Sequence, residues 1–171
     1  MQVLSIIILS VLACITYGVI HDQITARICV EYFTIGHPRV VPSVDPTVLA
    51  CVWGVIATWW VGAILGIPLA VVSRAGCRPP RDMSSLVRPI SILFAGTAIL
   101  AVAAGVVGYV AASNGWVILV GPLAQRVPVE KHVAFIVDLW AHVASYFGGF
   151  AGGIFLIVRV WRERGRSEKE K

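Results

Sequence analysis

The chain has 171 residues, of which 58% are hydrophobic and only 13% are charged, and it carries a formal net charge of +5. Soluble domains contain about 25% charged residues, so this composition, with a mean hydropathy of +0.85, excludes an ordinary soluble domain and is typical of a polytopic membrane protein. The positive charge does not indicate a nucleic-acid partner, because the basic residues stand beside apolar runs and form no basic face with interleaved aromatic residues.

The first apolar run extends from about Val3 to Ile20, which is just long enough to cross about 30 Å of hydrocarbon. Apolar residues continue beyond it at helical spacing, namely Ile24, Ile28, Tyr32 and Ile35. Gly36 followed by Pro38 predicts the end of the helix. We therefore predict either one long helix from Val3 to Ile35 or a span followed by an amphipathic helix at the membrane surface.

The second span is predicted from about Thr47 to Val72, after a short loop at 37–44 that contains two prolines. Asp45 followed by Pro46 is typical of an N-cap and the first helical position. Pro68 is expected to kink the last turns. Small residues at every fourth position, which let another helix approach closely, form a stripe: Gly54, Thr58, Gly62 and Gly66.

A basic loop at 74–88 precedes the third span, which is predicted from about Pro89 to Ala112. The loop that follows, 113–131, contains an apolar segment at 116–120. This segment is too short to cross a membrane, so we expect it to rest at the membrane surface.

The fourth span is predicted from about His132 to Trp161, and the charged tail at 162–171 is expected to be solvated. This span has a small-residue stripe of its own: Ala141, Ser145, Gly149 and Gly153. The sequence thus predicts one all-α domain, residues 1–171, folded as a bundle of four transmembrane helices.

The distribution of Lys and Arg predicts the orientation of this bundle. The 74–88 loop contains four basic residues and the segment from Arg159 onward six, whereas the other two loops contain two each. The positive-inside rule then places both termini in the cytoplasm. The stretch at 21–38 faces outward in this orientation.

Histidines and an aspartate gather in the outward-facing half. The histidines are His21, His37, His132 and His142. Asp138 and His142 lie one turn apart on one face of the fourth span, and Tyr146 continues that face. Tyr17 and His21 share a face of the first span at comparable depth. An aspartate within a span costs about 2.5–3.5 kcal/mol at the membrane centre, so such residues usually face the bundle interior or a wet cavity.

We interpret this pattern as a candidate metal site made by His21, Asp138 and His142, with His37 or Glu31 closing over it. Imidazole and carboxylate ligands suit zinc, iron or manganese. His21 and Glu31 would be about 15 Å apart on one straight helix, so both cannot bind one ion there. The same groups could instead relay protons. Polar support is expected from four further residues: Tyr17, Asp22, Arg27 and Tyr146.

Two other interpretations stay open. A haem b group could be held between His21 and His142, with glycines making room for the ring. Alternatively, the polar residues are structural. His142 and Asp138 would then form a satisfied polar pair, Arg27 would make exposed contacts at i, i+4 spacing, and the small-residue stripes would dock a partner membrane protein or a second copy. No HExxH, Walker or GxSxG motif is present, so a non-enzymatic role is favoured while an enzymatic one stays open.

The four cysteines do not indicate a disulfide framework or a zinc ribbon, because none is spaced as a CxxC pair and two lie inside apolar runs. Their simplest role is as small apolar fillers. Val11 to Cys14 resembles a lipoprotein cleavage box, yet the basic residues that should precede it are absent. Lipidation of Cys14 therefore stays open.

The longest polar stretch, His21 to Pro38, reads HDQITARICVEYFTIGHP, and Pro46 to Ala70 reads PTVLACVWGVIATWWVGAILGIPLA. Together they resemble a group of small, uncharacterised bacterial integral membrane proteins that share an HDxxTARxCxEYFTxGHP-like segment before a Trp-rich span. The resemblance covers roughly the first 70 residues well and the rest loosely. It implies a bacterial inner membrane and makes the outward segment the shared feature of the group, but it supplies no mechanism.

Overall fold

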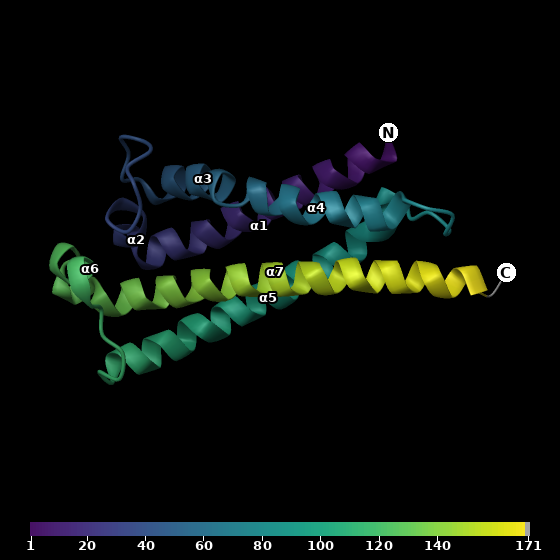
Figure 1. Ribbon diagram of the computed structural model, residues 1–171. Coiled ribbons are helices and arrows are strands. Elements are labelled where there is room, and N and C mark those ends of the chain that lie inside the picture. Colours follow the sequence, from purple (N-terminus) through teal and green to yellow (C-terminus); the bar gives the residue numbers. More distant parts are fainter. Residues whose placement is uncertain (170–171) are drawn as a thin grey trace.

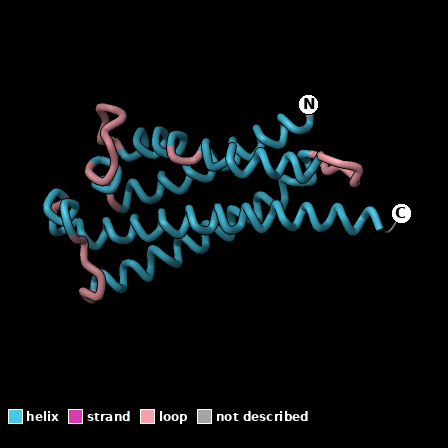
Figure 2. The backbone as a smooth tube through the Cα atoms, viewed as in Figure 1, coloured by secondary structure: helices cyan, strands magenta, loops and turns pink. Residues whose placement is uncertain are grey.

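The computed structural model describes residues 1–169, and these residues are mostly helical, with no strand among them (Figures 1 and 2). In chain order the elements are α1 (Gln2–Ile28), α2 (Val30–Thr34), α3 (Pro46–Ile56), α4 (Trp59–Arg74), α5 (Met83–Ser113), α6 (Gly121–Arg126), the 3₁₀ turn η1 (Val129–Lys131) and α7 (His132–Lys169). The all-α prediction is confirmed. The charged tail expected from residue 162 continues α7 to Lys169, and residues 170–171 lie outside the described part.

Four helical segments of the described chain are long and apolar enough to cross a membrane, as the sequence predicts. They are Gln2–Ile28, Pro46–Arg74, Met83–Ser113 and Val129–Arg166. Large apolar side chains also cover their outer surfaces. Ile99 and Val102 on α5, for example, are 72% and 67% exposed. Such a surface suits hydrocarbon rather than water.

The helices are arranged in two groups that face each other (Figure 1). α1 packs against α3 and α4, while α5 packs against α7, and the groups meet where α4 contacts α7 and α1 contacts α5. Both chain ends and the α4–α5 loop lie at one end of the bundle, and α2 and α6 lie at the other. The basic loop and the basic C-terminal segment are therefore neighbours.

The first helix ends earlier than the continuous helix predicted to Ile35. Cys29 has an extended backbone (φ −148, ψ 92), and a separate short helix, α2, begins at Val30. The break buries Tyr32 and Phe33 beside Phe135 of α7 in one apolar cluster. Tertiary packing of these aromatic side chains thus overrides the continuous helical periodicity of the sequence, and a separate short helix follows the first span.

The second span is interrupted at a place that the sequence did not indicate. Pro68 lies inside α4, and the helix breaks instead at Ala57 and Thr58. The hydroxyl of Tyr146 donates to the carbonyl of Ala57 at 3.1 Å, which satisfies an acceptor at the break. The predicted N-cap is confirmed, because the Asp45 carboxylate accepts from the Val48 N–H at 2.9 Å.

The small-residue stripe of the second span packs against α1 within the chain. A Cβ added at Gly54 would lie 2.6 Å from the Cα of Val19, and one added at Gly62 would lie 2.6 Å from the Cα of Val11. Backbone contacts this close leave no room for a side chain. These two glycines are therefore used inside the bundle and are not free to dock another protein.

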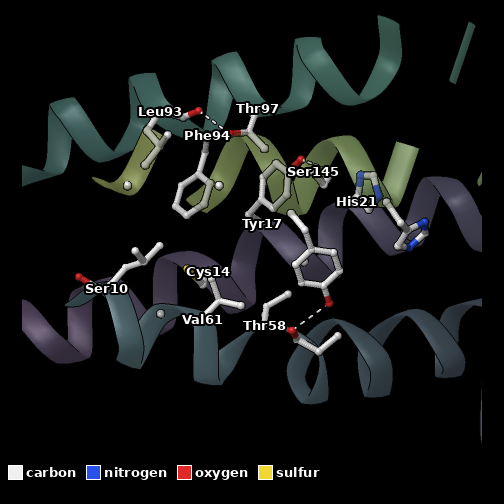
Figure 3. Close-up of a pocket in the computed structure, with 18 of the residues that line it drawn as sticks. Ser10, Cys14, Tyr17, His21, Thr58, Val61, Leu93, Phe94, Thr97 and Ser145 are labelled. Carbon is white, nitrogen blue, oxygen red and sulfur yellow. Dashed lines mark hydrogen bonds between the residues drawn. The ribbon is translucent and has the colours of Figure 1, made fainter. Parts of the chain in front are cut away.

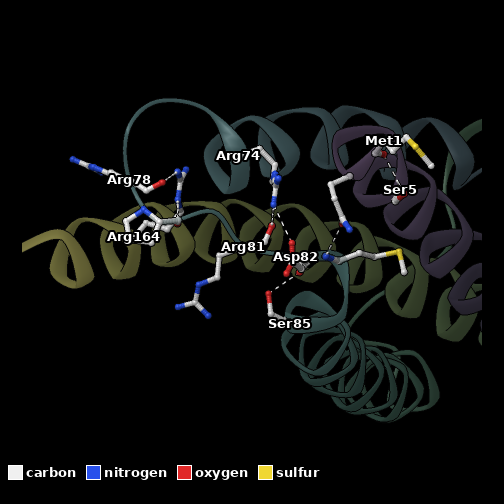
Figure 4. Close-up of polar contacts among 11 residues, drawn as sticks. Met1, Ser5, Arg74, Arg78, Arg81, Asp82, Ser85 and Arg164 are labelled. Atoms are coloured by element: carbon white, nitrogen blue, oxygen red, sulfur yellow. Dashed lines mark hydrogen bonds and ion pairs between the residues drawn. The ribbon is translucent and has the colours of Figure 1, made fainter. Parts of the chain in front are cut away.

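Polar contacts organise the end of the bundle that carries the chain termini (Figure 4). Arg164 of α7 is only 2% exposed. Its guanidinium donates to four backbone carbonyls at the end of α4 and in the loop that follows: Val72, Ala75, Arg78 and Pro79. This side chain therefore ties the basic α4–α5 loop to α7.

Candidate functional site

Three polar side chains meet inside the apolar bundle, near the end that carries α2. His21 and Asp22 come from the last turns of α1, and His142 comes from α7. One potential metal-ligand atom from each of the three lies within 4.8 Å of the others. His142 Nε2 is 3.3 Å from Asp22 Oδ1, with only 12% and 7% of these side chains exposed. We call these three residues the polar centre.

The hydrogen bonds of His142 define its chemistry. Its Nδ1 lies 2.8 Å from the backbone carbonyl oxygen of Asp138, one turn earlier in α7. A carbonyl oxygen can only accept, so Nδ1 carries the proton. In the neutral imidazole, Nε2 then presents its lone pair towards Asp22. A backbone carbonyl fixing the tautomer in this way is typical of histidines that bind metal ions.

His21 contributes a nitrogen that lacks a partner. Its Nε2 is buried and has no hydrogen bond to any residue of the described chain. The ring lies edge-on to His142 at a centroid distance of 4.7 Å, and it stacks on Tyr17 at 5.8 Å. Burying an unpaired polar atom costs free energy, so a ligand or ion that pairs with this nitrogen would be stabilising.

Aromatic side chains cover the polar centre from the side of α2. Tyr32 stacks on His142 at a centroid distance of 4.4 Å, and Phe33 lies edge-on to it at 5.7 Å. His37 follows, with Nδ1 2.9 Å from the Tyr32 carbonyl oxygen and its ring 4.7 Å from that of Trp53. Burial raises the pKa of the Tyr32 hydroxyl, which therefore stays neutral. The break at Cys29 thus folds an apolar cover over the centre.

The structure brings only some of the expected metal ligands together. His21 and His142 lie together in the polar centre, while the carboxylate beside them belongs to Asp22, which the sequence suggested only as support. Asp138 is fully buried, and neither of its carboxylate oxygens has a hydrogen-bond partner in the described chain. The polar pair expected between its carboxylate and His142 is therefore not formed. Glu31 lies 3.7 Å from Lys131 Nζ instead.

The expected supporting residues hold neighbouring helices in place. The hydroxyls of Tyr17 and Ser145 are 2.9 Å apart and join α1 to α7. Arg27 donates to the Gln23 side chain at 2.7 Å and to the Thr47 hydroxyl at 2.8 Å, at the start of α3. Tyr146 binds the α3–α4 break as described above. The role of Asp22 could not be read from its spacing, because adjacent residues point to different faces of a helix.

A cavity of about 110 Å³ leads away from the polar centre between the two groups of helices (Figure 3). His21, Asp22, His37 and His142 line one end. Beyond them the lining is mostly apolar or small and reaches Ser10 of α1. Figure 3 shows His21 at one side of the view and Ser10 at the other, with Tyr17, Cys14 and Phe94 between them. The polar centre is thus the head of a longer, mainly apolar space.

The contact between the two imidazoles bears on the haem interpretation. Axial histidines of a haem lie on opposite faces of the porphyrin, which separates their rings. The edge-on contact of His21 and His142 at 4.7 Å leaves no space for a porphyrin between them. The arrangement therefore suits a single ion better than a haem.

In comparisons with known proteins, no family model, curated protein or solved structure matches this chain.

Proposed function

We propose that this chain is an integral membrane protein that binds one divalent transition-metal ion through His21, Asp22 and His142. The observation that carries the proposal is the convergence of three ligand atoms within 4.8 Å from two helices that are far apart in the sequence. Two imidazoles and one carboxylate form a donor set that suits zinc, iron or manganese.

The polar centre has the features that such an ion requires. The Asp138 carbonyl holds Nδ1 of His142, which leaves Nε2 directed into the centre, and the Nε2 of His21 is buried without a partner in the described chain. A cation would also compensate the Asp22 carboxylate, whose burial away from water is otherwise costly. Three protein ligands leave a coordination position for water or for another ligand.

The proposed location is a bacterial inner membrane with both termini in the cytoplasm. The apolar outer surface of the four long helices supports insertion. The basic α4–α5 loop lies at the same end as both termini, which is the end that the positive-inside rule assigns to the cytoplasm. The polar centre would then lie in the half of the bundle that faces outward.

The direct test is metal analysis of the purified full chain after incubation with zinc, iron(II) or manganese(II) and removal of free ions. We expect about one ion per chain in the wild type and in His132→Ala, and loss of the ion in His142→Ala. His132 is a matched control, because its Nε2 is 3.0 Å from the Val127 carbonyl oxygen and it lies outside the polar centre. Circular dichroism establishes that each variant is folded.

Two results would overturn the proposal. One is a wild-type protein that binds none of the three ions. The other is a folded His142→Ala variant that retains the metal with unchanged affinity. Asp22→Asn provides a second, nearly isosteric variant if His142→Ala does not fold.

A further inference from the structure

We infer that the cavity beside the polar centre binds a single-chain amphiphile, with its oxygen-bearing head group at His21, Asp22 and His142 and its apolar chain running along α1 towards Ser10. The position of the head group rests on the proposed metal function. The position of the amphiphile's apolar chain rests on the shape and lining of the cavity alone.

The lining changes character along the cavity. The end at the polar centre offers nitrogen and oxygen atoms. The far end is lined by aliphatic side chains from three helices: Leu69, Ile90, Leu93, Leu156 and Ile157. A ligand that matches both ends has one polar head and one apolar tail, because a polar group at the aliphatic end would lose its hydrogen bonds.

The dimensions favour a single chain. Asp22 and Ser10 are twelve residues apart in α1, which corresponds to about 18 Å along the helix axis. A volume of about 110 Å³ distributed over this length is narrow. It is smaller than the cavity of about 150 Å³ that holds a benzene ring, so it takes a narrow chain and not a fused ring system, and the rest of a longer chain would extend out of it.

Gly149 on α7 shows that open space continues past the polar centre. This glycine lines the cavity, and a Cβ added to it would have no described atom within 4 Å. It lies seven residues after His142, which is about 10 Å along the helix. Residues that line an empty apolar space lose van der Waals partners on that side, and a hydrocarbon chain would supply them.

The surroundings of the bundle indicate where such an amphiphile would come from. Its outer surface is apolar and suited to hydrocarbon, so amphiphiles are the ligands present at the highest local concentration. An anionic head beside Asp22 would be repelled unless a metal ion stood between them. A carboxylate head should therefore require the metal, whereas an alcohol head should not.

The experiment uses the full chain in amphipol, free of detergent chains, with radiolabelled lauric acid and dodecanol as probes. Gly149→Leu fills the apolar part of the cavity. Gly96→Leu is the matched control, since a Cβ added at Gly96 would also have no described atom within 4 Å, whereas Gly96 does not line the cavity. We expect Gly149→Leu to weaken binding of both probes about tenfold or more, with Gly96→Leu unchanged and the metal content of both variants equal to wild type.

The outcomes separate the two proposals. Loss of lauric acid binding after metal removal, with dodecanol binding retained, supports both. A second outcome is that both probes bind without metal and are blocked by Gly149→Leu. That result supports the cavity as the site for the hydrocarbon chain and contradicts a head-group position that depends on the metal. Absence of probe binding, or equal binding by the two leucine variants, overturns the inference and leaves metal binding to be judged on metal content alone.

Discussion

Asp22 Oδ1 lies 3.3 Å from His142 Nε2, although 120 residues separate the two in the chain. The contact joins α1, which packs with α3 and α4, to α7, which packs with α5. The hydrogen bond between Tyr17 and Ser145 joins the same two helices further along the bundle. Polar groups in an apolar interior are costly unless they are paired. The Tyr17–Ser145 hydrogen bond therefore favours one register of α1 against α7, and the Asp22–His142 contact adds to it when a proton or a cation lies between the two atoms.

The two buried aspartates should respond differently to neutralisation. Asp22→Asn removes a charged ligand, so we expect metal affinity to fall by about 10–100-fold or more. Asp138→Asn changes a carboxyl that lies outside the polar centre and lacks a hydrogen-bond partner in the described chain. It should leave metal binding unchanged and stabilise the fold or leave it unaffected, because an unpaired buried charge is costly.

Metal titration and thermal unfolding of the two asparagine variants provide the measurements. The backbone carbonyl of Asp138, which holds the His142 tautomer, is retained in both variants. If Asp138→Asn lost the metal and Asp22→Asn kept it, the ligand set inferred from the sequence would replace the one inferred from the structure.

Arg164 should be important for stability at the end that carries the termini. Lysine keeps the charge but offers its donors from a single atom, so it cannot reach the four carbonyls that the guanidinium contacts. We expect Arg164→Lys to destabilise the protein by about 2–3 kcal/mol, since each buried acceptor left unpaired costs about 1–3 kcal/mol. Arg162→Lys, two residues earlier at an exposed position, is the control. Equal unfolding temperatures for the two variants would contradict this role.

The glycine contacts predict where an added methyl group would force two closely packed helices apart. Gly62→Ala places a methyl group 2.6 Å from the Cα of Val11, so α4 and α1 must separate. We expect a loss of about 1–3 kcal/mol in unfolding free energy, as for other overpacked positions. Gly96→Ala, at an open site on α5, should be neutral or slightly stabilising, because alanine is the better helix former. Thermal unfolding of both variants in the same detergent makes the comparison.

Cys29 should be chemically silent in the folded protein. Burial raises the pKa of its thiol to about 12, and its side chain is only 1% exposed. An unfolded chain loses the thiol proton near pH 8.5, so this group favours folding below that pH and its contribution declines as the pH rises towards 12. Alkylation at pH 8 should modify the exposed Cys77 and spare Cys29 until the protein is unfolded. Rapid labelling of Cys29 in the native protein would contradict the burial.

Elements whose causes are local can be predicted from the sequence. Apolar length set the four long helices, since a run of about 20 apolar residues is needed to cross hydrocarbon. Asp45 followed by Pro46 marked the start of α3, because an N-cap acts within one turn of helix. The periodicity also placed His21 and His142 on faces that could meet.

Features that depend on two helices at once emerge from the packing of the folded bundle. The break at Cys29 arises because Tyr32 and Phe33 pack beside Phe135 of α7, about a hundred positions away. Asp22 supplies the carboxylate of the polar centre because of the way α1 is rotated against α7. Periodicity describes the faces of one helix, whereas rotation and depth are set by close packing between helices, which can expose either of two adjacent residues to a shared interior. The cavity that extends from the polar centre has the same origin.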